Sequence, residues 1–164
     1  TNTFRHFWLQ KLGLNHDHYT NLQMETGTAF EHRILEFIGV NRMDRQIRIR
    51  GYRLRVNLDG ETSDEISEVK THKSHTFKVS RAYWMQAQVE MYAARKNLRI
   101  VAYHLEPDDY KNWFREIDAD RLSYHKIEYD HAFVENEYLP RIRYLAHCLR
   151  KGVFPIDGDY IRER

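Results

Sequence analysis

The sequence predicts an α/β (α+β) fold with a central mixed β-sheet flanked by helices. Two observations predict this class: some segments repeat apolar residues at helical spacing, and segments between them alternate apolar and polar residues with a period of two. The expected order is helices, three strands, a helix, two strands and a final helix, which suits a sheet covered by helices. We expect residues 1–164 to form a single domain, because this length is typical of one hydrophobic core.

Two helices are expected at the start of the chain. A short amphipathic helix fits residues 4–12, because its apolar residues recur at helical spacing and Gly13 follows. After a polar stretch, a longer helical pattern runs to about Gly39. Its apolar stripe consists of Phe30, Ile34, Phe37 and Ile38. Glu31 lies beside this stripe, and a glutamate on a helix usually faces solvent.

Three strands are expected after this helix. Residues 46–59 alternate apolar and polar side chains around a turn at Gly51 and Tyr52, which predicts a hairpin with one apolar face. Residues 60–64 form a polar loop, and residues 65–71 are expected to be the third strand.

The second half of the chain continues the same alternation of elements. Ser80 could cap a helix that runs to about Lys96. Residues 98–105 and 122–129 are rich in β-forming side chains and predict two further strands. Asp130 is placed to cap the final helix.

Composition narrows the classes of function only a little. The formal net charge is +2, so bulk charge neither requires nor excludes a polyanionic partner. Cys148 is the only cysteine, which excludes an internal disulfide framework and a cluster or zinc site built on several thiolates. No apolar run approaches the roughly 18 residues that span a bilayer. We therefore expect a soluble cytoplasmic protein with no membrane partner.

Asp59, Glu68 and Lys70 are the residues that we expect to catalyse a metal-dependent reaction. Hydrolysis of a phosphodiester needs a divalent cation, and Mg²⁺ prefers carboxylate and carbonyl oxygens. If the second and third strands are neighbours, Asp59 and Glu68 can converge on one ion and Val69 can add its backbone carbonyl. Lys70 emerges on the same face as Glu68 and could hold the attacking water or stabilise charge on the phosphate. It could act as a base only if burial lowered its pKa.

The segment from Asp59-Gly60 to Glu68-Val69-Lys70 resembles the signature of the PD-(D/E)XK nuclease superfamily, which has the restriction-endonuclease-like core. Residues 88–92 match the Q-x-x-x-Y helix motif of its RecB-like exonuclease branch, and residues 83–91 look like the corresponding helix of the phage λ exonuclease (YqaJ-like) group. Residues 27–31 resemble the upstream helix that carries an acidic residue. The likeness covers about residues 25–105. It departs from the family where Leu58 stands in place of the usual proline.

This resemblance implies a metal-dependent DNA exonuclease of phage or prophage recombination or of bacterial DNA repair, in the cytoplasm of a bacterial or phage-infected host cell. It implies that Asp59 and Glu68 bind Mg²⁺ or Mn²⁺ with the Val69 carbonyl, that Lys70 positions the nucleophile, and that Glu31 completes a second metal shell. Relatives that carry an iron–sulfur cluster use four cysteines, so we expect no cluster here.

For DNA, the resemblance implies that Gln88 and Tyr92 help to orient the strand, since they lie one helical turn apart. Gln86 is not on that helix face and is a weaker candidate. Four arginines line one face of the hairpin and could track a phosphate backbone: Arg48, Arg50, Arg53 and Arg55. The implied partners are DNA, further copies of the chain that encircle DNA, and a single-strand annealing protein.

Several other interpretations stay open on the sequence alone. Asp59 before Gly60 could be a turn residue, and Glu68 with Lys70 could be a solvated pair on a strand. The arginines could simply solvate a strand edge. A structure-selective endonuclease would use the same centre, and a non-catalytic nucleic-acid-binding module would keep the fold without hydrolysis.

Overall fold

The computed structural model describes residues 6, 9–10, 14 and 21–156. Its chain divides into two compact units. The first consists of Thr1–Tyr19, Arg48–Leu54 and Asp130–Arg164, and the second of Thr20–Ile47 and Arg55–Tyr129. The expected single domain stays a prediction.

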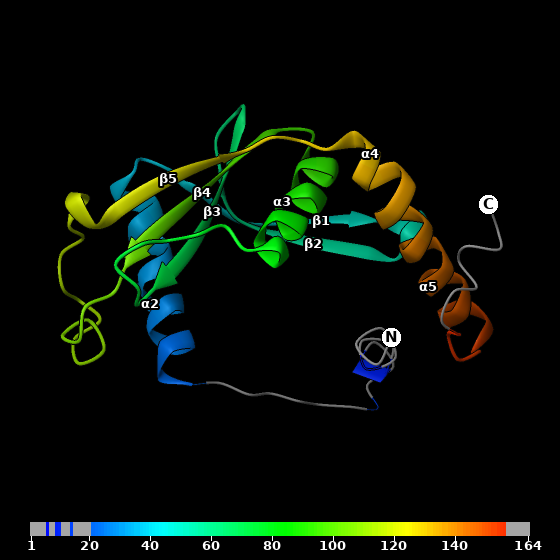
Figure 1. Cartoon of the computed structure of the whole chain (residues 1–164), viewed down its shortest axis with the longest axis horizontal. Coiled ribbons are helices and arrows are strands. Elements are labelled where there is room, and N and C mark those ends of the chain that lie inside the picture. Colours follow the sequence, from blue (N-terminus) through cyan, green and yellow to red (C-terminus); the bar gives the residue numbers. More distant parts are fainter. Residues whose placement is uncertain (1–5, 7–8, 11–13, 15–20, 157–164) are drawn as a thin grey trace. The chain divides into compact units, whose positions relative to one another are not determined.

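A five-stranded sheet in the order β1-β2-β3-β4-β5 organises the chain (Figure 1). Its strands are Arg42–Ile49, Leu54–Glu61, Glu65–His72, Asn97–His104 and Leu122–Ile127. β2 pairs with β3 antiparallel, β3 with β4 parallel, and β4 with β5 antiparallel. The predicted class, a mixed sheet flanked by helices, is confirmed.

Two helices of the second unit pack on this sheet, and each begins at a capping side chain. Asn21 caps α2 (Leu22–Phe37) by accepting a hydrogen bond from the Met24 amide at 2.9 Å. Ser80 caps α3 (Arg81–Ala94) by accepting one from the Tyr83 amide at 3.2 Å. These caps satisfy amides that lack a partner in the first turn of a helix.

α2 and α3 cover opposite faces of β3 and β4, because successive side chains of a strand alternate between faces. Val69 and Tyr103 join a core with Phe30 of α2, and the rings of Phe30 and Tyr103 stack at 5.8 Å. Lys70 has the opposite parity and lies beside Tyr83 of α3. The face toward α2 is therefore apolar, and the face toward α3 carries the polar residues expected to do chemistry.

The segment between β4 and β5 had no clear pattern in the sequence, and a buried carboxylate organises it. Asp109 is fully buried and accepts hydrogen bonds from Arg115 at 3.0 Å, Arg121 at 2.6 Å and the Glu106 amide at 2.7 Å. The short helix η2 (Ala119–Arg121) then leads into β5. Such a loop is stabilised by charge pairs rather than by a periodic apolar pattern, so periodicity could not reveal it.

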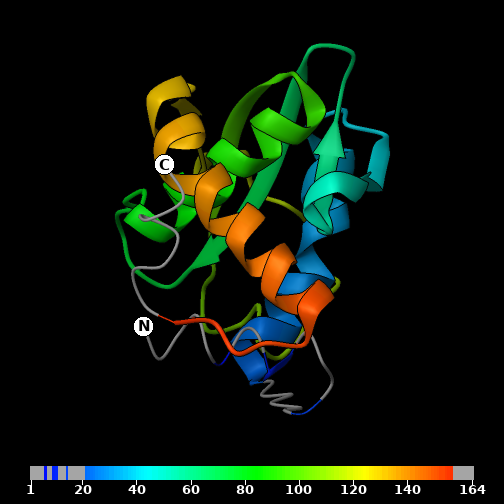
Figure 2. The same ribbon diagram turned by 90° about the vertical axis from the view of Figure 1, so that its right-hand side faces the viewer.

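In the first unit, α4 (His131–Phe133), the π-helical turn η3 (Val134–Tyr138) and α5 (Leu139–Lys151) form one unbroken helical run (Figure 2). Asp130 caps the run, as predicted, by accepting a hydrogen bond from the Phe133 amide at 2.8 Å. The run ends at Gly152, whose φ of 65° lies in the left-handed region that glycine adopts easily.

Some element boundaries differ from the prediction. β1 begins at Arg42, earlier than residue 46, and α3 ends at Ala94 because Arg95 adopts a left-handed φ of 57°. The helix expected over residues 4–12 falls mostly outside the described residues. Within the described part of the chain, no helix is both long enough and apolar enough to cross a membrane.

Candidate active site

β2 and β3 bring Asp59, Glu68 and Lys70 together in the second unit. Gly60 pairs with Ser67 in the antiparallel register, so Asp59 lies opposite Glu68. Asp59 Oδ2 accepts a hydrogen bond from the Val69 amide at 2.9 Å, which fixes the Asp59 side chain on the edge of β3. The expected convergence of the two carboxylates is therefore present.

Gly60 makes this placement of Asp59 sterically feasible. A Cβ at residue 60 would lie 2.6 Å from Leu35 Cδ2 and 2.8 Å from Val40 Cγ1, both in the core under α2. Only glycine lets β2 approach these side chains so closely. Gly60 thus allows the close packing of β2 that positions the neighbouring Asp59.

The Glu68 carboxylate is buried, and two side chains donate hydrogen bonds to one of its oxygens. Only 2% of the residue is exposed, and its Oε1 accepts hydrogen bonds from Lys70 Nζ at 2.5 Å and Gln86 Nε2 at 2.6 Å. Its other oxygen, Oε2, is buried without a hydrogen-bond partner. A buried carboxylate oxygen with no partner is costly, so it calls for a ligand at that point.

Glu90 of α3 adds a third acidic group. Gln86 Nε2 also donates to Glu90 Oε1 at 2.8 Å, while Glu90 Oε2 is buried without a partner. Like Glu68, Glu90 is only 2% exposed. Gln86 therefore links two buried carboxyl groups, although the sequence indicated only a weaker role for Gln86 and none for Glu90.

The carboxyl groups of this cluster hold protons more tightly than usual. Burial and then the nearby Glu68 charge raise the pKa of Asp59 from 3.8 to about 7. The same two causes raise the pKa of Glu90 to about 9. Burial and then the Asp59 charge raise the pKa of Glu31 to about 7. The cluster has more negative charge than its single lysine can balance.

The pKa of Lys70 is raised as well, which in an amine favours the charged form. Burial acts to lower the pKa of its ammonium group, but the Glu68 and Asp59 charges outweigh burial and the pKa is raised. Lys70 is therefore a firmly held cation, which supports the electrostatic role expected from the sequence over the role of a base.

Other buried carboxylates among the described residues are fully paired. Glu61 is 1% exposed and lies 2.7 Å from Lys96, 3.0 Å from Arg45 and 3.3 Å from Arg42. Although burial acts to raise it, Lys96 and Arg45 lower the pKa of Glu61. Asp109 is likewise paired with two arginines. The chain thus neutralises buried acids elsewhere and leaves the cluster around Glu68 short of positive charge.

This shortage fits a divalent cation. The group offers only oxygen ligands to a metal, which hard cations such as Mg²⁺ and Mn²⁺ accept. Glu68 Oε2 accepts no hydrogen bond from a donor group among the described residues, and the Asp59 carboxyl group lies close enough to share a proton with Glu68. The residues present therefore fit the cation that the sequence predicts.

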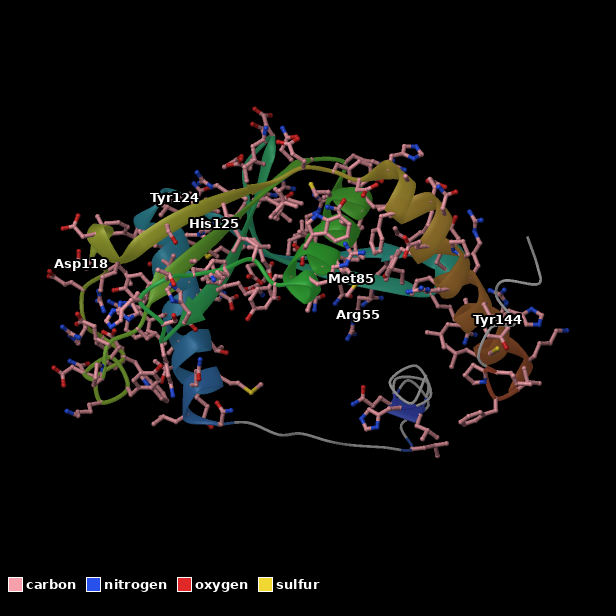
Figure 3. The ribbon with its side chains drawn as sticks, viewed as in Figure 1. Arg55, Met85, Asp118, Tyr124, His125 and Tyr144 are labelled. Carbon is pink, nitrogen blue, oxygen red and sulfur yellow. The ribbon has the colours of Figure 1, made fainter. Side chains whose placement is uncertain are left out.

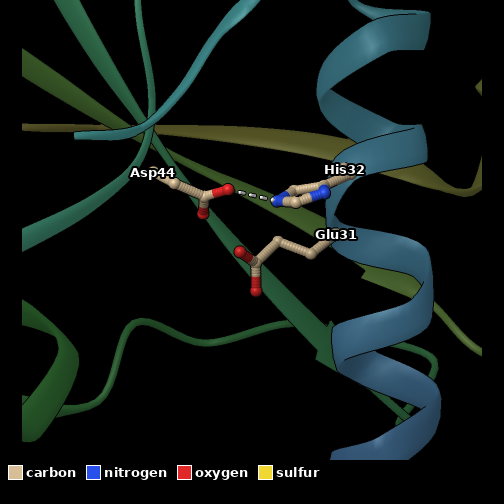
Figure 4. A group of neighbouring side chains, drawn as sticks. All are labelled: Glu31, His32 and Asp44. Atoms are coloured by element: carbon tan, nitrogen blue, oxygen red, sulfur yellow. Dashed lines mark ion pairs between the residues drawn. The ribbon is translucent and has the colours of Figure 1, made fainter.

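Glu31 is close to Asp59 and also belongs to a second group of side chains, with His32 and Asp44. The carboxylate of Glu31, the His32 ring and the Asp44 carboxylate each have a ligand atom within 4.8 Å of the others, and His32 Nε2 lies 3.0 Å from Asp44 Oδ2 (Figure 4). His32 and Asp44 are exposed. Proximity to Asp59 is thus compatible with the outer metal role expected for Glu31.

A hollow of about 270 Å³ opens beside these residues in the second unit. Glu31, Lys70 and Tyr83 line it together with the first turns of α2. Lys70 Nζ lies 5.1 Å from the centre of the Tyr83 ring. The hollow gives solvent and small groups a path to the Lys70 ammonium.

The residues expected to bind DNA lie elsewhere. Gln88 is fully buried and donates to the Glu128 carbonyl at 2.9 Å, so it is not directed toward Glu68. Tyr92 is half-buried, with the Arg95 guanidinium over its ring. Arg53 does not alternate with the strand as expected, because it precedes β2 and has a left-handed φ of 50°. Arg55 is exposed and extends away from β2 (Figure 3).

The sequence did contain a signal for the residues that were missed. Tyr83, Gln86 and Glu90 are spaced i, i+3 and i+7, so they share one helix face. Gln86 and Gln88 are about 200° apart around the helix, so only one can face Glu68. The local motif did not show which face of α3 turns toward the sheet.

The comparisons with known proteins add little. A scan of protein-family models and a search of curated proteins both give no match to this sequence. Among solved structures, the crystal structure of SSO0001 aligns with 92% of this chain and 85% of its own, at 15% sequence identity and a TM-score of 0.45. A likeness at that level supports no inference about fold or activity.

Proposed function

We propose that this chain is a Mg²⁺- or Mn²⁺-dependent deoxyribonuclease with Asp59, Glu68 and Lys70 as its centre. The observation that carries the proposal is the unequal hydrogen bonding of the two carboxylate oxygens of Glu68. Lys70 and Gln86 hold its Oε1, and its Oε2 stays buried and without a partner next to Asp59. A surface ion pair would instead have both oxygens in water.

Asp59 and Glu68 would hold the cation, with Glu31 beyond Asp59 as an outer carboxylate. When bound, the cation lowers the pKa of a water molecule and neutralises charge on phosphate oxygens. Asp59 and Glu68 meet this need because their own repulsion decreases when positive charge is added between them. The same residues would then keep their full charge at neutral pH.

Lys70 supplies the positive charge that the protein itself contributes. In hydrolysis, a water oxygen forms a bond to phosphorus, the bond to one ester oxygen breaks, and that oxygen gains a proton. Negative charge grows on the phosphate during this exchange, and an ammonium held beside it lowers the barrier. The raised pKa of Lys70 keeps this ammonium protonated.

We further propose that the enzyme degrades DNA from an end, as the family resemblance implies. In this proposal, the hollow beside Lys70 that Glu31 and Tyr83 line receives the phosphate group nearest the end of the strand. Exposed Arg55 has the charge to contact a backbone phosphate.

The test is cleavage of end-labelled linear and closed-circular DNA in Mg²⁺, Mn²⁺ and EDTA by the wild type and Asp59→Asn. We expect the wild type to degrade linear DNA only with a metal, to spare closed circles, and to lose activity on substitution. Cutting of closed circles would replace the exonuclease proposal with an endonuclease. A folded wild type that binds DNA but never cuts it would contradict the enzyme and favour a binding module.

A further inference from the structure

Glu90 occupies a position that the proposed centre does not use directly. It lies on α3, it is 2% exposed, and within the cluster it accepts a hydrogen bond from Gln86. Gln86 has one side-chain nitrogen with two protons, and the two hydrogen bonds from this nitrogen go to Glu90 Oε1 at 2.8 Å and Glu68 Oε1 at 2.6 Å. The orientation of the Gln86 carboxamide therefore depends on both carboxyl groups.

We propose that Glu90 is a positioning residue that holds the Gln86 carboxamide against Glu68 Oε1 and so reserves Glu68 Oε2 for the cation. This inference rests on the proposed function, because it assigns a role toward the same metal centre. Gln86 is an exposed residue with a long, flexible side chain, and without an anchor its amide would rotate among several rotamers. Glu90 supplies that anchor one helical turn away.

The geometry distinguishes Glu90 from a direct metal ligand. Among the described residues, Asp59, Glu68 and Glu90 do not form a group whose ligand atoms all lie within 4.8 Å of one another. The contact of Glu90 is instead with the Gln86 carboxamide, which also donates to Glu68.

The hydrogen bond that Glu90 accepts from Gln86 predicts which substitutions of Glu90 keep its positioning role. Glu90→Gln keeps an oxygen that can accept a hydrogen bond from Gln86. Glu90→Leu keeps a similar volume but removes the acceptor. Met91→Leu is the matched control, since Met91 is a buried neighbour on α3 whose side chain is apolar.

The test is the Mn²⁺ affinity of the DNA-free protein at pH 7.5, measured by calorimetry. Removing an outer partner of a metal ligand typically weakens binding about 10- to 100-fold. We expect this loss in Glu90→Leu, affinity within about threefold of wild type in Glu90→Gln, and no change in Met91→Leu. Amide NMR should show the Gln86 carboxamide resonances shifted in Glu90→Leu and retained in Glu90→Gln.

A double-mutant cycle tests whether Glu90 acts through Gln86, and it uses an exposed site that tolerates change. Gln86→Leu should reproduce the loss, and adding Glu90→Leu should weaken Mn²⁺ binding no further. Additive losses, wild-type affinity in Glu90→Leu, or equal losses in Glu90→Gln and Glu90→Leu would each overturn the proposal. So would a wild type that binds no Mn²⁺.

DNA cleavage by the same variants separates this inference from the proposed function. Loss of Mn²⁺ affinity in Glu90→Leu, in a protein whose wild type never cuts DNA, would keep the positioning role and refute the nuclease. Metal-dependent cleavage by a wild type whose Glu90→Leu variant binds Mn²⁺ normally would keep the nuclease and refute the positioning role.

Discussion

Replacing Asp59 by asparagine should stabilise the metal-free protein while it removes metal binding. Asparagine keeps an oxygen that can accept from the Val69 amide, which Asp59 Oδ2 does at 2.9 Å. It also removes a carboxylate that burial and the Glu68 charge make unfavourable in the folded state. A functional carboxylate held at the expense of stability is a common feature of active sites.

The raised pKa gives the size of the effect. Folding raises the pKa of Asp59 from 3.8 to about 7, and each pH unit between them is worth about 1.4 kcal/mol, or about 4 kcal/mol in all. Glu68 shares this repulsion, so we expect Asp59→Asn to raise the free energy of unfolding by about 2 to 4 kcal/mol at pH 8.

The sign of the pH dependence follows from proton binding. Between pH 3.8 and about 7 the folded state keeps the Asp59 proton and the unfolded state does not, so stability falls as pH rises through this window. The penalty is complete above pH 7 and shrinks to about 1 to 2 kcal/mol at pH 5.

Urea unfolding in EDTA at pH 8 and pH 5 measures this difference. The gain from Asp59→Asn should be larger at pH 8 than at pH 5. The reasoning would be refuted by a variant that is less stable than the wild type at pH 8, or by a gain that is the same at both pH values.

Three further predictions follow from the same structure. Gly60→Ala should lower the free energy of unfolding by about 1 to 3 kcal/mol in urea titrations, because its Cβ would lie 2.6 Å from Leu35; wild-type stability would contradict this packing. Glu61→Ala should lower the free energy of unfolding by about 3 kcal/mol in the same assay, because it removes the buried carboxylate that pairs with Lys96 and Arg45. Glu65→Ala breaks a more exposed pair with Arg99 and should lower it by less than about 1 kcal/mol. Mn²⁺ should bind about tenfold more tightly at pH 8 than at pH 6, because one proton with a pKa of about 7 on Asp59 competes with it; calorimetric affinity that is constant over this range would count against Asp59 as a ligand.

The periodic parts of the fold could be predicted from the sequence. β3 was expected over residues 65–71 and spans Glu65–His72, and Ser80 and Asp130 cap helices as predicted. Each of these features depends on local spacing or on a side chain that contacts the backbone a few residues away. The Asp109 loop could not be predicted, because its charge pairs join residues that no local pattern connects.

The residues of the candidate site likewise divide into those that the sequence could predict and those that it could not. Asp59, Glu68 and Lys70 could be grouped because they lie on adjacent strands at a fixed parity. Gln88 was favoured over Gln86 because the motif was matched without knowing how α3 is rotated on the sheet. That rotation depends on how the buried face of α3 packs, which includes Ala87 and Met91.

The most direct test of the central claim is the cleavage rate of an end-labelled linear duplex in saturating Mn²⁺ by the wild type and Lys70→Met. Methionine keeps much of the length of lysine and removes the ammonium that lies 2.5 Å from Glu68 Oε1. We expect the rate to fall by at least about 100-fold, as when a group that stabilises charge in the transition state is removed. A wild type that leaves the duplex intact, or a Lys70→Met variant that cleaves it at the wild-type rate, would contradict the assignment of this centre.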